Sequence, residues 1–415
     1  MIEGTVSRRR TVEALRSGVP SRDAVGALGS AQPAIASSFE ALLDDVDAGR
    51  GNRGLLVGGN FGSGKSHLLE HLRHLALERR FVTSKVVISK ETPLYDPVKV
   101  FRAAVSNSLV PGRRGSGLGD VARELDFGSE RVRELARWVD GDDAALNERF
   151  GATLYLYKDL HGSDEDFAER IVRFWSGEPI AAGEIKRRLR EAGEAASWPL
   201  SKVTLSELAL QRFRFAAALI KAAGYGGWIL LFDEVELIGR YSLLQRGKSY
   251  AELARWAKGF DDERVPWLGA VLAVSGDLQT VVIDEKNDHE NVPARFRERG
   301  DELLAARAER GISIIRRDTL HLERPDRPML EDAYRKLRTL HSEAYGWDAP
   351  ELSVELGSLE RSMRQYVRAW IYEWDLRRLD PGYRPAIEVG ELAPDYSEEP
   401  ELELPPEGDT GAADG

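Results

Sequence analysis

The fold follows from the stretch Arg53-Gly54-Leu55-Leu56-Val57-Gly58-Gly59-Asn60-Phe61-Gly62-Ser63-Gly64-Lys65-Ser66-His67. Its part from Gly59 to Ser66 fits the phosphate-loop spacing G-x-x-x-x-G-K-[ST] without a mismatch. The apolar residues 55–57 indicate a buried strand before the loop, and leucines at helical spacing follow it. Strand, glycine loop and helix in this order are the context that the motif requires. The stretch therefore predicts a nucleotide-binding loop.

Each residue type in this loop suits phosphate chemistry. The glycines let the backbone fold tightly, so that its N–H groups point toward the phosphates. The helix that starts at Gly64 directs the positive end of its dipole at the same anion. Lys65 would add a charge for the β- and γ-phosphates, and the Ser66 hydroxyl would bind Mg²⁺. We therefore expect ATP and Mg²⁺ as ligands, with nucleotide contacts at Gly59, Asn60, Phe61, Gly62, Ser63, Gly64, Lys65, Ser66 and His67.

A second motif ends the most apolar run of the chain, residues 227–234, with Asp233-Glu234. A continuous apolar run is typical of a central parallel strand that is covered on both faces. Ligands of open α/β sheets bind at the carboxyl ends of such strands. Asp233 would hold Mg²⁺ opposite Ser66, and Glu234 would polarise the attacking water. The alternative, a pair of capping acids at a strand end, is disfavoured by the phosphate loop upstream.

The next apolar run, residues 267–276, places the hydroxyl of Ser275 at the same edge of the predicted sheet. A polar residue there can orient the lytic water or contact the γ-phosphate. Glu234, Lys65 and Ser275 are therefore the catalytic candidates. The alternative stays open that Ser275 merely ends a strand before Gly276.

Two further patterns are weaker. His67 and His71 fit the zinc pattern H-x-x-E-H, but no third ligand can be named and their helix already carries the phosphate loop. Polar residues on the exposed side of that helix are the favoured interpretation. Residues 245–249 repeat Gly-Lys-Ser, but position 242 is Ser242 rather than glycine and no strand precedes it. This segment indicates an exposed break in a helix.

Composition narrows the class of protein. The 415 residues suggest two or three domains, and a hydrophobic content of 42% is enough for a sizeable core. The chain has no cysteine, which excludes disulfides and fits a reducing cytoplasm. No stretch approaches the roughly 20 apolar residues of a membrane span, so we expect a cytoplasmic protein without a membrane partner. The net charge of −11 comes largely from an acidic C-terminal stretch that carries no Lys or Arg.

The pattern of elements predicts an α/β P-loop NTPase of the AAA+-like kind, with a parallel sheet flanked by helices. We expect an N-terminal helical segment (1–50), an ATPase core (51–109 and 204–325), a helical insertion (110–203), a C-terminal helical lid (326–385) and an acidic disordered tail (386–415). The N-terminal segment would hold two helices. In the core we expect one long helix over 237–260, a short strand over 311–315 and a final strand over 319–322.

Phosphoryl transfer needs positive charge beyond Lys65, and two sources are candidates. The run 295–299 would face the nucleotide of a neighbour if the subunits form a ring. Arg361 and Arg364 would lie in the C-terminal lid. For any single arginine the favoured alternative is a solvated helix face. The basic clusters to weigh for DNA contact are Arg8–Arg10, Arg113-Arg114, 186–190 and 295–317. Most of them alternate with acids at helical spacing, which usually means intrahelical pairs.

The order of these motifs resembles the AAA+ class, on the side of the origin-recognition and transposition ATPases. More narrowly, three segments are similar to the BREX-system ATP-binding family, of which the BrxD-type proteins are the short members. These segments are Arg10-Thr11-Val12-Glu13-Ala14-Leu15-Arg16-Ser17-Gly18-Val19-Pro20-Ser21-Arg22-Asp23-Ala24-Val25, Gly62-Ser63-Gly64-Lys65-Ser66-His67-Leu68-Leu69 and Phe232-Asp233-Glu234-Val235-Glu236. The resemblance runs from about residue 8 to 380. The phosphate loop is specific to the superfamily, and the N-terminal segment carries the narrower assignment.

The resemblance implies a role in bacterial phage defence, beside a methyltransferase, a phosphatase-like protein and a helicase as candidate partners. It assigns ATPase roles to Lys65, Ser66, Asp233 and Glu234, makes Ser275 a γ-phosphate sensor, and makes Arg364 the lid arginine. One feature strains the match to a compact core. Lys65 and Asp233 are 168 residues apart (233 − 65), and the helical insertion accounts for the excess.

Two hypotheses follow. In the first, the protein is a DNA-associated ATPase that hydrolyses Mg·ATP and moves its lid and insertion against a partner, alone or as a homo-oligomer. In the second, it is a nucleotide-gated assembly switch that recruits a helicase or methyltransferase with little turnover. A phosphotransferase is less favoured, because no acceptor site is visible.

Overall fold

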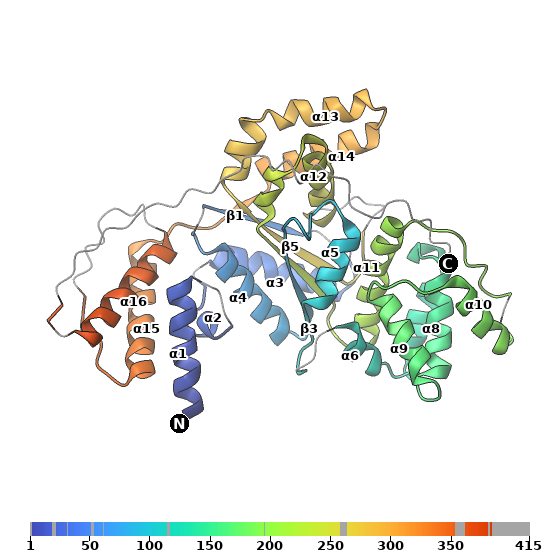
Figure 1. Ribbon diagram of the computed structural model, residues 1–415, viewed down its shortest axis with the longest axis horizontal. Coiled ribbons are helices and arrows are strands. Elements are labelled where there is room, and N and C mark those ends of the chain that lie inside the picture. Colours follow the sequence, from blue (N-terminus) through green and yellow to red (C-terminus); the bar gives the residue numbers. More distant parts are fainter. Residues whose placement is uncertain are drawn as a thin grey trace.

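The centre of the molecule is a six-stranded sheet between two layers of helices (Figure 1). The computed structural model describes residues 2–18, 22–30, 32–50, 54–60, 62–113, 117–194, 196–257, 264–352, 362–380 and 382–383. The strands are β1 (Leu55–Gly59), β2 (Val82–Val87), β3 (Ser108–Leu109), β4 (Trp228–Asp233), β5 (Leu268–Ser275) and β6 (Leu320–His321). Their order is β3-β2-β4-β5-β1-β6, and only the β2–β3 pair among them is antiparallel. The expected mixed α/β fold with a mostly parallel sheet is confirmed.

The two central strands carry the longest apolar runs. Every residue of β4 and β5 is buried, as expected for parallel strands that are covered on both faces. Alternate residues of β4 enter different cores: Ile229 and Leu231 join one apolar cluster, and Leu230 and Phe232 join another. Asp233 continues the alternation and ends β4 on the side of Leu231.

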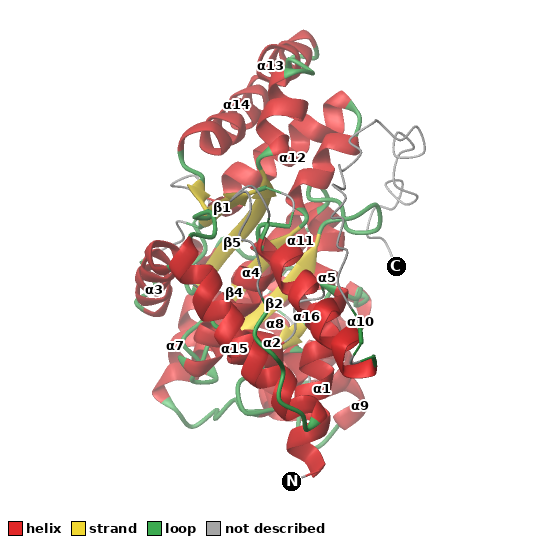
Figure 2. Ribbon diagram, turned by 90° about the vertical axis from the view of Figure 1, so that its left-hand side faces the viewer, coloured by secondary structure: helices red, strands yellow, loops and turns green. Residues whose placement is uncertain are grey.

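Helices cover both faces of this sheet (Figure 2). On the Leu231 side lie α3 (Pro33–Asp47) and α4 (Lys65–Glu78), which share an apolar cluster with β1, β4 and β5. The other side is covered by α5 (Pro97–Ser106), α11 (Leu205–Ala222) and α12 (Leu243–Ala257). Two further helices, α13 (Asp288–Glu298) and α14 (Glu302–Arg317), pack on α12 and lie at the top of Figure 1.

The described residues between β3 and α11 form five helices and a short 3-10 turn. The helices are α6 (Leu118–Arg123), α7 (Glu130–Val139), α8 (Glu148–Leu160), α9 (Glu165–Trp175) and α10 (Ala182–Glu191). Their apolar faces are continuous with the core of the sheet. Arg212 of α11 anchors them, because its buried guanidinium donates to the carbonyl oxygens of Phe174 (3.0 Å) and Glu178 (2.9 Å) at the end of α9.

The helices of the N-terminal segment pack on two different parts of the molecule. Helix α3 packs on the sheet, whereas α1 (Ile2–Ser17) and α2 (Arg22–Leu28) pack on α15 (Arg327–Tyr345) and α16 (Met363–Leu379). The apolar residues of these four helices form a cluster of their own, which includes Val12, Leu337 and Trp374. We call α1, α2, α15 and α16 the lid helices. The sequence indicated neither the short helix α2 nor this association of the two ends of the chain.

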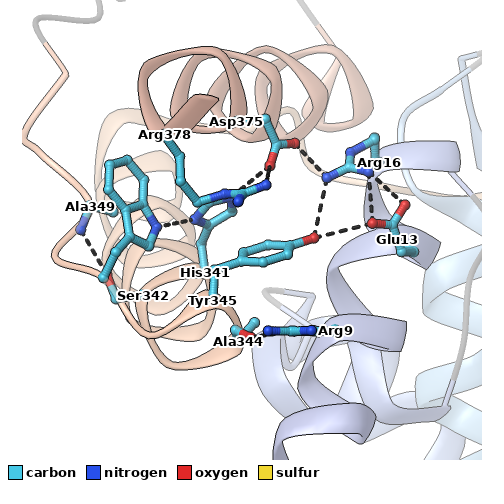
Figure 3. Close-up of polar contacts among 11 residues, drawn as sticks. Arg9, Glu13, Arg16, His341, Ser342, Ala344, Tyr345, Ala349, Asp375 and Arg378 are labelled. Carbon is cyan, nitrogen blue, oxygen red and sulfur yellow. Dashed lines mark hydrogen bonds and ion pairs between the residues drawn. The ribbon is translucent and has the colours of Figure 1, made fainter. Parts of the chain in front are cut away.

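A polar network ties α1 to the C-terminal helices (Figure 3). Arg16 donates to Asp375 at 2.5 Å, and Asp375 also accepts from Nε2 of the fully buried His341 at 3.1 Å. Nδ1 of His341 accepts from the indole N–H of Trp347, so it is the Nε2 atom that carries the proton donated to Asp375. Two arginines of the basic cluster Arg8–Arg10 also join α1 to α15. Arg8 pairs with Glu343, and Arg9 donates to the carbonyl oxygen of Ala344.

Two expectations about the core are wrong. Residues 311–315 are not a strand but lie in α14, because an apolar run of this length suits a buried helix as well as a strand. Gly311 sits there because a Cβ atom would come within 1.9 Å of the carbonyl oxygen of Tyr250 on α12. The region expected as one helix over 237–260 is a 3-10 turn (Val235–Arg240) followed by α12, and residues 258–260 lie outside the described ones.

The segment 245–249 is not an exposed helix break. It lies inside α12, and Arg246, Gly247 and Ser249 are buried. Gly247 packs against the ring of Phe296, and Arg246 makes a two-pronged ion pair with Asp288 of α13 at 2.8 and 2.9 Å. The glycine and the arginine therefore serve helix packing.

The substitution Asp288→Asn is expected to lower the free energy of unfolding by about 3–5 kcal/mol. Asp288 is fully buried and also accepts from the hydroxyl of Tyr250, so the variant replaces the carboxylate beside the buried Arg246 charge by a neutral amide. Urea denaturation measures the change. Glu298→Gln, which removes an exposed ion pair with Arg295 on the same helix, is the control and should have little effect. Equal stability of the two variants would show that the Arg246–Asp288 ion pair does not stabilise the packing of α12 on α13.

Candidate nucleotide-binding site

The loop between β1 and α4 has the backbone of an anion site. Gly62 and Gly64 have φ angles of 76° and 103°, which glycine adopts without strain. Gly64 precedes α4, and no side chain caps the helix, so the first N–H groups of α4 remain available to an anion. The hydroxyl of Ser63 is buried and has no hydrogen-bond partner among the residues that the structure describes. Phe61 lies outside the described residues.

Lys65 is held inside this loop. Its side chain is 9% exposed, and its ammonium group donates to the carbonyl oxygen of Gly59 at 3.0 Å and to that of Asn60 at 3.4 Å. The loop thus curls around the charge that would meet the phosphates. Gly59 must be small, because a Cβ atom there would come within 2.5 Å of Ser63 Oγ.

Ser66 and Asp233 meet across the sheet, although 167 residues separate them. The Ser66 hydroxyl donates to Asp233 Oδ1 at 3.2 Å. The other oxygen of Asp233, Oδ2, is paired with the ammonium of Lys85 on the neighbouring strand β2 at 2.9 Å. Hydroxyl and carboxylate oxygens are the ligands that Mg²⁺ prefers, so this pair fits the metal of a Mg·nucleotide. Sequence reasoning missed Lys85, since only the register of β2 beside β4 brings it there.

Glu234 leaves β4 in a left-handed conformation, with a φ angle of 59°. This conformation is costly for a residue with a Cβ atom and is concentrated at functional sites. The backbone N–H of Glu234 donates to Asp233 Oδ1 at 3.1 Å, which fixes the bend. The side chain is half-buried at the carboxyl edge of the sheet, next to Asp233.

Ser275 lies at the end of β5, between β1 and β4 in the sheet. Its hydroxyl bonds to Asp277 at 3.1 Å. Its backbone N–H donates to Glu236 Oε2 at 3.2 Å, and Oε1 of the same carboxylate lies 3.6 Å from the Lys65 ammonium. Glu236 is buried, and sequence reasoning gave it no role.

A cleft lies beside the phosphate loop, between α4 and the lid helices. Its walls include Ser63, Ser66 and His67 of the loop and Arg364 and Val367 of α16. Gly62 touches the start of α16, since a Cβ atom there would come within 2.9 Å of Ser362 Oγ.

His67 ties the phosphate helix to the segment between α2 and α3. Its Nε2 lies 2.8 Å from the carbonyl oxygen of Gly29, to which it donates. Burial lowers the pKa of His67, so the imidazole is neutral near pH 7. The same segment is bound to the end of β6 by Gln32, whose side-chain amide pairs with both backbone groups of Glu323. The N-terminal segment is thus a wall of the cleft.

Of the arginine candidates, Arg364 lines the cleft, and its side chain lies 3.3 Å from the position of a Cβ atom on Gly18. Arg361 lies outside the described residues. The run 295–299 lies on α13 and is largely paired within its own hairpin. Arg295 pairs with Glu298, and Arg297 pairs with Glu302 and Glu309. On α10, Lys186 and Arg190 are exposed.

The described residues include neither a membrane-spanning helix nor a cluster of metal ligands. None of the described helices is long and apolar enough to cross a membrane. Within the same residues, no group of three or more His, Cys, Asp and Glu side chains could hold a metal ion. His67 and His71 therefore have no third protein ligand of these types among the described residues.

A protein-family model matches most of the chain. The model of the family described as BREX system ATP-binding protein BrxC/D covers residues 5–124 and 129–370. These ranges contain the N-terminal helices, all six strands, the phosphate loop and Asp233. The resemblance expected from the sequence is confirmed. No curated protein and no solved structure matches the chain.

Proposed function

The chain belongs to the BREX system ATP-binding family, which implies ATP binding and a role in phage defence, and from this premise we propose that it is an AAA+-like ATP hydrolase. The observation that carries the proposal is the meeting of two distant motifs. Lys65 and Ser66 begin α4, and Asp233 ends β4, yet Ser66, which lines the cleft, donates a hydrogen bond to Asp233.

The cleft gives each part of the nucleotide a place. The triphosphate would lie against the N–H groups at the start of α4, with the Lys65 ammonium beside it. The base would lie between the phosphate helix and the lid, where Leu15, Met329 and Val367 supply apolar surface. Arg364 at the start of α16 would bring a second cation to the phosphates from the lid side.

Ser66 and Asp233 would hold the magnesium ion of the bound nucleotide. When bound, Mg²⁺ neutralises phosphate charge. Asp233 is the stronger ligand of the two, and its pairing with Lys85 and Ser66 keeps the carboxylate oriented in the structure. Glu234, next along the chain, would accept the proton of the attacking water, and Ser275 would contact the γ-phosphate from β5.

A second function is favoured by one specific observation. Two lysines of the site are paired with its own acids in the structure, Lys65 with Glu236 and Lys85 with Asp233. Such a self-paired site suits a nucleotide-gated assembly switch, whose turnover waits for a partner. The partner would be another BREX system protein, such as a helicase or methyltransferase, or DNA.

An ATPase assay on the full chain tests the proposal and separates the two functions. We expect Mg²⁺-dependent release of phosphate from ATP. Strong stimulation by duplex DNA alone supports a DNA-associated ATPase, and stimulation only by another BREX system protein supports the switch. Absence of both ATP binding and hydrolysis under all three conditions would falsify the proposed function. Mass measurement in solution, with and without ATP, reports whether a second copy completes the site.

A further inference from the structure

One buried carboxylate of the site has no role in the proposed chemistry. Glu236 is 5% exposed and lies in the 3-10 turn that follows β4, two residues after Glu234. The left-handed backbone at Glu234 turns the chain back, so that the Glu236 side chain points under the phosphate loop rather than into solvent. Burying a carboxylate costs free energy unless it has polar partners, so the partners of Glu236 indicate its role.

The two oxygens of Glu236 have different partners. Oε2 accepts from the backbone N–H of Ser275 at 3.2 Å, which fixes the carboxylate to the end of β5. Oε1 lies 3.6 Å from the ammonium of Lys65. The same ammonium donates to the carbonyl oxygens of Gly59 and Asn60. Lys65 therefore sits between three oxygens of the protein, and Glu236 supplies the carboxylate oxygen among them.

The charges around Glu236 make its ion pair with Lys65 the main interaction that favours the ionised carboxylate. Burial raises the pKa of Glu236, and the Lys65 charge opposes that rise, whereas Glu234 and Asp233 add to it. Lys65 is the cation that favours the ionised form, while the two neighbouring acids repel it. The carboxylate and the ammonium depend on each other in the empty site.

We propose that Glu236 is a positioning residue that holds the Lys65 ammonium in the empty site and competes with the phosphates of the nucleotide for it. This inference rests on the proposed function, because it concerns the binding of ATP. It goes beyond that function, because it assigns the resting position and the available charge of Lys65 to a carboxylate outside the phosphate loop. Glu236 thereby limits the affinity for phosphate and lets the nucleotide leave.

The inference predicts a gain of affinity on removing a charge. Glu236→Gln keeps an oxygen for the Ser275 N–H but takes away the anion beside Lys65, so the ammonium attracts phosphate more strongly. We expect the dissociation constants of ATP and ADP to fall about three- to tenfold. Adenosine, which brings no phosphate to Lys65, should bind unchanged. Isothermal titration calorimetry on the full chain measures all three, with competition against a fluorescent nucleotide for adenosine.

Two variants control this experiment. Glu236→Asp keeps the charge and should leave the ATP dissociation constant within about twofold of the parent protein. Glu373→Gln makes the same substitution in an equally buried carboxylate that pairs with Arg377 on α16, away from the phosphate loop. It should not change the affinity for ATP. A gain in both Glu→Gln variants would show a general effect of net charge and would overturn the inference.

Thermal melting gives a second measurement if Glu236→Gln is less stable. The variant leaves Lys65 without its counter-ion, so its melting temperature without nucleotide should fall, and the rise on adding ATP should exceed that of the parent protein. A merely structural Glu236 would give weaker or unchanged ATP binding and an equal or smaller rise. If the parent protein itself binds no ATP, the proposed function fails. If it binds ATP and Glu236→Gln binds no better, only the inference about Glu236 fails.

Discussion

Lys65→Ala is expected to weaken ATP binding by about 100-fold or more and to abolish hydrolysis. The ammonium of Lys65 is enclosed by the phosphate loop, where it bonds to the carbonyl oxygens of Gly59 and Asn60 and excludes most water. A charge in such a place interacts with phosphate more strongly than an exposed charge does. Alanine removes the charge, and with it the cation that favours the ionised form of the buried Glu236.

The control for this variant is Lys248→Ala. Lys248 stands in a second Gly-Lys-Ser sequence, but it is exposed on α12, and its neighbours Gly247 and Ser249 are buried in helix packing. The control should bind and hydrolyse ATP like the parent protein. Calorimetry and a phosphate-release assay measure both variants, with melting curves to compare their folding. Normal turnover in a folded Lys65→Ala protein would remove the phosphate loop from the mechanism.

The features predicted best from the sequence depend on short, local patterns. The phosphate loop needs glycines at fixed spacing, and the all-apolar runs of β4 and β5 are typical of buried strands with cover on both faces. Because both motifs stand at the carboxyl ends of parallel strands, the hydrogen bond between Ser66 and Asp233 could be anticipated across 167 residues.

The features that the sequence did not predict depend on which distant segments of the chain come together in the folded protein. The partners of Lys65 and Asp233, Glu236 and Lys85, come from the turn after β4 and from the register of β2 beside β4. The run 311–315 looked like a strand because β-branched isoleucines suit both a strand and a buried helix. The helix is favoured because Gly311 packs closely against the backbone of Tyr250, a contact that no local sequence pattern reveals.

The joining of the chain ends in the lid was missed for the same reason. Helix α1 shows an apolar face, but that face does not reveal that its partners are α15 and α16, more than 300 residues away. Arg16 and Asp375 complete the contact with an ion pair that is visible only in three dimensions (Figure 3). The N-terminal sequence that carries the family resemblance is therefore also a structural part of the lid.

Glu234→Gln is expected to reduce the turnover of ATP by about 100-fold or more while leaving ATP binding within a few-fold of the parent protein. The glutamine keeps the size of the side chain and suits the left-handed backbone at this position as well as glutamate does. The hydrogen bond from its backbone N–H to Asp233 is retained. The only loss is the carboxylate that would accept a proton from the attacking water.

The separation of binding from turnover distinguishes this role of Glu234 from that of its neighbours. Lys65→Ala should lose both binding and turnover, and Glu236→Gln should gain binding, whereas Glu234→Gln should hold ATP without cleaving it. Single-turnover measurement with labelled ATP tests the chemical step directly, and Glu234→Asp, which keeps a shorter carboxylate, should retain a measurable part of the rate. If Glu234→Gln cleaves ATP as fast as the parent protein, the general base must be another residue at the edge of the sheet, and the strained backbone at Glu234 serves only to turn Glu236 toward Lys65.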